Sequence, residues 1–233
     1  MLLSEIFDQL TYGELKQLDM GGDDGGAIDQ KDYPQVVAHV NLGLTELYKR
    51  FPIKMRTVTI EQDASIGTYF LDSTFSAVDG TASTLYLIDT VADRFIDNVL
   101  KVEKIRDVDG DLLDFNDANS ITSINTYDYN AISIPNPVTG TFISVEYRAD
   151  HDPISPIELD PTTVEVKLPR SLLASLLQYV GYRAYATTPP IDGVDRSGQY
   201  LAKFEAGLTK LVNLDLINDV EKENQKLWNN GWP

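Results

Sequence analysis

Five aspartates crowd one short stretch of this chain, and clustered carboxylates of this kind are the ligands of calcium sites. The five are Asp107, Asp109, Asp111, Asp114 and Asp117. A calcium loop of the EF-hand type also requires Gly at its sixth position and Glu at its twelfth. Counted from Asp107, these positions hold Leu112 and Ala118. The stretch therefore favours a polar hairpin with Asx-type turns, in which Asp109-Gly110 forms a two-residue hairpin turn, and it predicts no metal site.

Histidine, a frequent acid–base and metal-binding side chain, occurs only at His39 and His151. His39 lies in a helical pattern and His151 just after a strand pattern, and no G-x-S-x-G nucleophile motif is present. Metal binding would need a further organised set of ligands. Cysteine is absent, which excludes disulfides, thiol catalysis and Cys-ligated zinc and favours assembly in a reducing cytoplasm. We therefore expect two structural histidines, no catalytic residue, no cofactor and no metal.

Two further patterns resemble functional sites without meeting their requirements. The loop 21–26 is rich in glycine, but it lacks the lysine of a P-loop and follows no strand, so we expect a solvated loop. The 36 acidic residues must include carboxylate pairs of the kind that cleave glycosidic bonds, yet no spacing singles one out. Neither pattern identifies an active site.

The composition is that of an acidic protein with a folded core. The 233 residues include 36 acidic and 19 basic side chains, for a formal net charge of −17, and 42% are hydrophobic. A body this acidic does not bind duplex DNA or anionic membranes through its general surface, because both require basic residues. We expect no signal peptide, and no stretch reaches the roughly 18 consecutive apolar residues of a membrane span.

Apolar residues at helical spacing predict helices near both ends of the chain. The first spans 33–51 and is capped by Asp32. The second spans 170–186. The last spans 198–227 and would be about 45 Å long at 1.5 Å per residue. Asp215 interrupts its apolar stripe, so we expect a bend or a change of packing partner there.

Between these helices the apolar period changes to two, which is typical of strands. The strand-like segments are 58–60, 85–88, 99–106, 131–134, 142–148 and 163–168. The sequence therefore predicts an α+β fold. In it, a helical bundle of residues 1–53 and 169–233 carries an inserted antiparallel β-sandwich or barrel-like region at 54–168.

The order of these segments resembles that of the head-to-tail adaptor, or connector, proteins of tailed bacteriophages over residues 3–212. The motifs that carry the resemblance are Asp32-Tyr33-Pro34, Tyr48-Lys49-Arg50-Phe51, Val99 to Ile105 before Asp109-Gly110, Leu113-x-Phe115-Asn116-Asp117, Phe142 to His151, and Val164 to Pro169 before Leu172-Leu173-x-x-Leu176-Leu177-x-Tyr179-Val180-x-x-Arg183. None of these motifs is catalytic, and their order carries the inference.

The resemblance implies a structural virion protein, located in the neck of the phage particle and assembled in the host cytoplasm, and not an enzyme. Twelve copies would form a ring that docks on the portal protein and receives downstream tail or nozzle proteins. Genomic DNA would pass through the lumen without specific binding, and no membrane would be involved. We hypothesise that many of the acidic residues line this channel.

Candidate contacts between copies or with partners lie on the last two predicted helices and in the tail. They are Tyr179, Arg183, Tyr185, Phe204, Leu208, Trp228 and Trp232. We expect the apolar stripes of these helices to exceed what a single copy can cover. The tryptophan pair could dock on a partner, because aromatic anchors are favoured at interfaces, or fold back on the chain's own surface.

Two other functions remain open at this point. One is a neck or tail-completion protein at another level of the same channel, which would differ in its binding partner. The other is a carbohydrate-binding or glycosidase β-domain with added helices, in which replacement of particular acidic residues would abolish sugar binding or hydrolysis.

Overall fold

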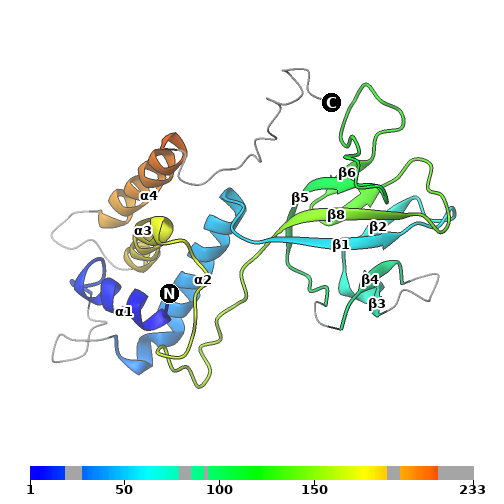
Figure 1. The fold of residues 1–233 in the computed structure, drawn as a ribbon. Helices are drawn as coiled ribbons and strands as arrows, with labels where there is room; N and C mark the ends of the chain where they lie inside the picture. The colour runs from blue at the N-terminus through cyan, green and yellow to red at the C-terminus, as the bar shows by residue number, and fades with distance from the viewer. Residues whose placement is uncertain (19–27, 79–84, 92–93, 188–194, 215–233) are drawn as a thin grey trace, which may run out of the picture. The chain divides into compact units, whose positions relative to one another are not determined.

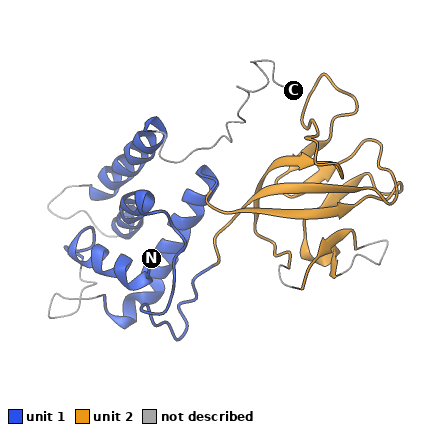
Figure 2. Cartoon of the chain, in the orientation of Figure 1, with its two compact units in different colours: residues 1–52, 153–233 blue, residues 53–152 orange. Residues whose placement is uncertain are grey.

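The computed structural model describes residues 1–18, 28–78, 85–91, 94–187 and 195–214. The chain forms two compact units, coloured separately in Figure 2. Unit 1 comprises Met1–Pro52 and Pro153–Pro233, and unit 2 comprises Ile53–Asp152. The fold is mixed α+β, with the α-helices in one unit and the sheets in the other, which confirms the predicted fold class.

The described part of unit 1 contains four α-helices and one short 3₁₀-helix (Figure 1). They are α1 (Leu3–Tyr12), η1 (Gln30–Asp32), α2 (Tyr33–Arg50), α3 (Arg170–Ala186) and α4 (Arg196–Asn213). The predictions for α2 and α3 are confirmed to within one residue. Asp32 is the N-cap residue of α2, but its side chain makes no capping hydrogen bond.

The helix α3 is the centre of unit 1, because it contacts α1, α2 and α4. Its side chains at Leu172, Leu176 and Val180 are fully buried. Gly43 of α2 allows the close approach of α3, since a Cβ atom there would lie only 2.7 Å from Leu176 Cδ1. The core of unit 1 is therefore organised around one helix.

The last helix differs from its prediction at both ends. Helix α4 begins at Arg196, where the Asp195 side chain accepts a hydrogen bond from the Gly198 N–H group at 3.2 Å. It ends at Asn213, well before the predicted position. The expected bend at Asp215 lies outside the described residues. None of the described helices has the length and apolar character that a membrane crossing requires.

Unit 2 contains two sheets that share one apolar core. The first has the strand order β3-β4-β1-β8-β5 and the second β2-β7-β6. The strands are β1 (Met55–Glu61), β2 (Thr68–Phe70), β3 (Ser76–Val78), β4 (Leu87–Asp89), β5 (Val99–Arg106), β6 (Asn125–Asp128), β7 (Ala131–Ser133) and β8 (Phe142–Ala149), with a 3₁₀-helix, η2 (Ser73–Phe75), before β3. Neighbouring strands are antiparallel except β3 and β4, which are parallel. The sheets form no closed barrel.

The strand predicted at 163–168 is wrong, because this segment joins neither sheet. It instead forms an isolated antiparallel bridge with the N-terminus, between Leu2 and Glu165. The Val166 N–H group donates to the Met1 carbonyl at 2.8 Å, and the Tyr48 hydroxyl donates to the Lys167 carbonyl. Residues 153–168, which the strand-like pattern places in the β insert, consequently belong to unit 1.

Candidate subunit interface

Aromatic side chains join α3 to α4 in unit 1. Tyr179 of α3 packs edge to face against Phe204 of α4, with ring centroids 5.2 Å apart. One turn and a half further along α3, Tyr185 stacks on Tyr200 of α4 at 5.5 Å and an interplanar angle of 14°. Such pairs stabilise by about 0.5–1.5 kcal/mol beyond the area they bury. The aromatic contacts therefore hold α4 along one face.

The rest of α4 is largely uncovered by the described residues. Its buried residues are Phe204 and Leu208. Apolar side chains elsewhere on the helix and at its end are exposed to 36% at Leu201, 60% at Val212 and 55% at Leu214. One face of α4 is thus packed inside the unit, and the others are available for contacts outside it.

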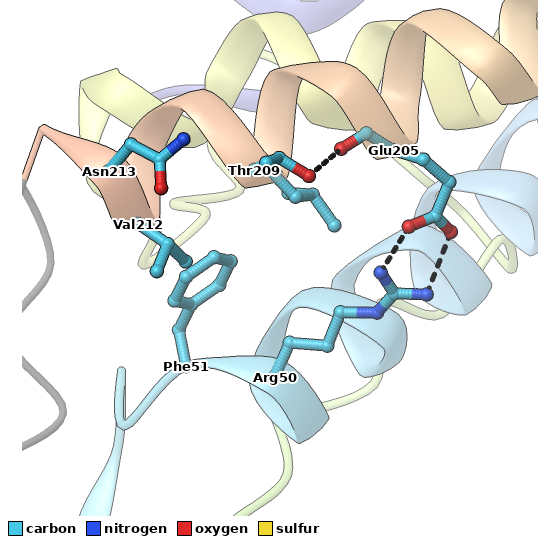
Figure 3. Close-up of a pocket in the computed structure, with 7 residues that line it drawn as sticks. Arg50, Phe51, Glu205, Thr209, Val212 and Asn213 are labelled. Carbon is cyan, nitrogen blue, oxygen red and sulfur yellow. Dashed lines mark hydrogen bonds and ion pairs between the residues drawn. The ribbon is translucent and has the colours of Figure 1, made fainter.

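An ion pair fastens α4 to the end of α2. Arg50 donates two hydrogen bonds to the Glu205 carboxylate, at 2.6 and 2.8 Å (Figure 3). The same guanidinium lies 5.4 Å from the Phe204 ring centroid. The hydrogen bond from Arg50 lowers the pKa of Glu205 and raises that of Arg50. The planar guanidinium can do both because it pairs with a carboxylate through its edge and with a ring through its face.

A pocket of about 270 Å³ lies beside this ion pair (Figure 3). Its lining residues are Arg50, Phe51, Glu205, Leu208, Thr209, Val212 and Asn213. Phe51 and Leu208 are buried, so the pocket is apolar at its base, while the ion pair and Asn213 add polar groups. In Figure 3 the Phe51 ring points towards Val212.

The predicted contact residues fall into three groups. Tyr185, Phe204 and Leu208 have buried side chains that pack within unit 1, whereas Tyr179 and Arg183 are half-buried. Trp228 and Trp232 lie outside the described residues. A role of any of these side chains in contacts between copies or with partners stays a prediction.

Three residues of this site, Arg50, Glu205 and Val212, are absent from the contacts predicted from the sequence. Arg50 and Glu205 are 155 positions apart, so nothing in a single sequence pairs them. Val212 is an apolar residue within the predicted helix 198–227, and only the packing shows that it is left uncovered.

Both histidines have buried side chains. His39 of α2 is only 8% exposed, and neither ring nitrogen has a hydrogen-bond partner in the described part of the chain. Burial, and then the nearby charge of Arg183, lower the pKa of His39. His151 is also buried, with its Nδ1 atom 3.0 Å from the Asp152 carbonyl oxygen.

The aspartate-rich stretch forms turns. The Asp107 carboxylate accepts the N–H groups of Asp109 at 3.0 Å and Asp111 at 2.9 Å. The predicted two-residue hairpin turn is wrong: the Asp107 N–H group donates to the Asp111 carbonyl, and Gly110 has a positive φ of 87°. This is a three-residue loop, in which glycine takes the left-handed position. No group of three or more potential metal ligands occurs in the described residues.

Within the described residues, α4 packs along one face against α3 and the end of α2, and its other faces are exposed. A family model described as SU10 adaptor protein matches residues 10–225. The chain therefore belongs to the SU10 adaptor protein family of phage head-to-tail adaptors, and its role is structural. A search of curated proteins finds no match.

Proposed function

We propose that this protein forms a ring beneath the portal of a tailed phage, receives the next tail component and lets DNA pass through its centre. Family membership supports the adaptor role. The proposal that copies form a ring rests on the exposure of α4, in which only the side chains of Phe204 and Leu208 are buried. A closed ring needs two different surfaces on each copy that fit one another. The exposed faces of α4 provide one such surface.

The side chains on these faces suit a contact between helices. Ala202 and Ala206 are exposed and lie one turn apart, so they share a face of α4. Small side chains let a neighbouring backbone approach closely, and Leu201 next to them adds apolar area. Burial of such area on assembly stabilises by roughly 25 cal/mol per Å². A neighbouring copy packed here would cover what the protomer leaves exposed.

The acidic composition suits a channel through which DNA must pass without being bound by its wall. The chain has 36 acidic and 19 basic residues. A carboxylate and a phosphate about 10 Å apart repel by roughly 0.4 kcal/mol in water, which is below thermal energy. Repulsion of this size does not block DNA, but it removes attractive sites at which sliding would stall. A net basic lumen wall in the assembled ring would contradict this part of the proposal.

The test is to mix the protein with purified portal rings and examine the product by electron microscopy. We expect a second ring stacked on the portal. Ala206→Arg should abolish it, because the long charged side chain occupies the α4 face. Ala174→Arg, at an exposed position of α3, is the matched control and should leave the stacked ring intact. Binding to another neck component in place of portal would overturn the proposed position.

A further inference from the structure

The pocket beside the Arg50–Glu205 pair lies where the described chain ends. Val212 and Asn213 line it, and Leu214 follows them as the C-cap of α4. Val212 is 60% exposed, although Phe51 in the same pocket is buried. An apolar recess with one uncovered wall is typical of a binding groove that an apolar group completes.

The size and the lining of this recess fit an aromatic ring. An apolar cavity of about 150 Å³ accommodates benzene, so a recess of about 270 Å³ has room for the two fused rings of an indole. Arg50 stands at its side, and arginine is the commonest cation in contacts with tryptophan faces. Thr209 and Asn213 carry oxygen atoms that can accept the indole N–H.

The chain beyond Leu214 contains both tryptophans of the protein, Trp228 and Trp232. We propose that the recess between α2 and α4 is the docking site for Trp228 of the same chain. Residues 215–227 connect Trp228 to α4. When extended they can span roughly 45 Å, which is more than Trp228 needs to reach back to the recess, because Val212 and Asn213 at the end of α4 already line it. A tethered group of this kind faces an effective concentration in the millimolar range. The chain's own tryptophan therefore outcompetes that of a second copy in dilute solution, and Trp228 has a shorter tether than Trp232.

Tryptophan fluorescence of the unmodified protein tests this directly, because both tryptophans lie in the tail and their emission reports on it alone. We expect an emission maximum shifted to shorter wavelength than in urea, and a lower acrylamide quenching constant. Both should persist in Trp232→Phe and disappear in Trp228→Phe. The emission maximum and the quenching constant of the unmodified protein should stay the same when the protein is diluted about a hundredfold.

Variants of the recess locate the docked ring. Val212→Glu, which puts a charge on the exposed wall, should restore the emission and quenching of the unfolded chain. Val212→Ala should do so partly. Leu201→Glu, an exposed apolar position of the same helix outside the recess, is the matched control and should keep the shifted emission. Circular dichroism should show the same helix content in all three.

Three results would overturn the proposal. Emission like that of the unfolded chain in the native protein would show that Trp228 is not docked. Shifted emission that survives Val212→Glu would place the tryptophan elsewhere. A shift that appears only as protein concentration rises would assign the recess to the tail of a second copy.

Discussion

The two C-terminal helices, α3 and α4, have nearly the same length and opposite environments. Helix α3 has 17 residues and buries eight of them: Leu172, Ser175, Leu176, Leu177, Val180, Gly181, Ala184 and Tyr185. Helix α4 has 18 residues and buries only Phe204 and Leu208. The difference arises because three helices surround α3, whereas α4 rests on α3 and the end of α2.

The contrast between the two helices suggests different roles: α3 stabilises the folded protomer, and the outer faces of α4 make contacts outside it. The expectation that the apolar stripes exceed what one copy covers does not hold for α3, whose stripe is buried inside unit 1 apart from the half-buried Leu173. On α4 the described residues leave Leu201 and Val212 exposed. Changes on α3 should therefore lower the stability of the protomer, and changes on the outer faces of α4 should act on contacts made outside it.

The largest expected effect is at the centre of α3. Leu176→Ala removes a fully buried side chain and should lower the free energy of unfolding by about 2–5 kcal/mol, because it leaves a cavity at the contact of α3 with α2. Urea unfolding followed by circular dichroism measures this. The matched change on α4, Leu201→Ala, should stay within about 0.5 kcal/mol of the unmodified protein. Equal effects at the two positions would remove the contrast between the helices.

The next effect tests the close approach of α2 to α3. Gly43→Leu should lower the free energy of unfolding by about 1–3 kcal/mol, because the new side chain meets Leu176 and Tyr179 at the helix contact. Thermal unfolding provides the comparison. Gly67→Ala in unit 2 is the control, since a Cβ atom added there would have nothing within 4 Å of it, and a small effect is expected.

The free energy of unfolding should depend on pH through His39 of α2, which lies near Arg183 of α3. The pKa of buried His39 lies below 6.5, so the unfolded chain takes up the proton first as the pH falls. The free energy of unfolding should therefore have its full value above about pH 6.5, where His39 is neutral in both states, and should decrease below that pH. Urea unfolding between pH 7.5 and roughly pH 5 should show this decline. In His39→Gln it should be weaker, and an identical decline would exclude His39 as its source.

The smallest effect concerns the attachment of α4. Arg50 and Glu205 are partly exposed, so a double-mutant cycle with Arg50→Ala and Glu205→Ala should give a coupling energy of about 0.2–1 kcal/mol. The pKa of Glu205 is lowered, so the coupling is present above about pH 4.5 and is lost as the pH falls through the folded-state pKa. A coupling energy of zero at neutral pH would mean that the ion pair does not hold α4.

The sequence predicts α2 and α3 well, but it predicts the end of α4 and the short strands poorly. The segments 33–51 and 170–186 carry apolar stripes over several turns, so the period is unmistakable. Strand β6, by contrast, has the sequence Asn-Thr-Tyr-Asp and no apolar alternation, and β2 has only three residues. The segment 163–168 alternates like a strand, but it bridges to the N-terminus instead. Pairing partners depend on the whole fold.

The candidate site likewise contains residues that the local sequence pattern predicts and residues that it does not. Phe204 and Leu208 follow from helical spacing, because the side chains that join two helices lie on their apolar stripes. Tyr179 lies off the stripe predicted for its helix, and only the structure shows that it packs against Phe204. The bidentate contact of Arg50 with Glu205 joins distant parts of the chain, and the exposure of Val212 depends on which neighbours cover it. Neither property can be read from local pattern.

A cryo-electron microscopy reconstruction of the protein assembled on its portal would show whether α4 forms the contact between copies. We expect a closed ring with a central channel, in which the Ala202–Ala206 face of α4 packs against the adjacent copy. A reconstruction in which that face points to solvent in every copy, or in which no ring forms on the portal, would contradict it.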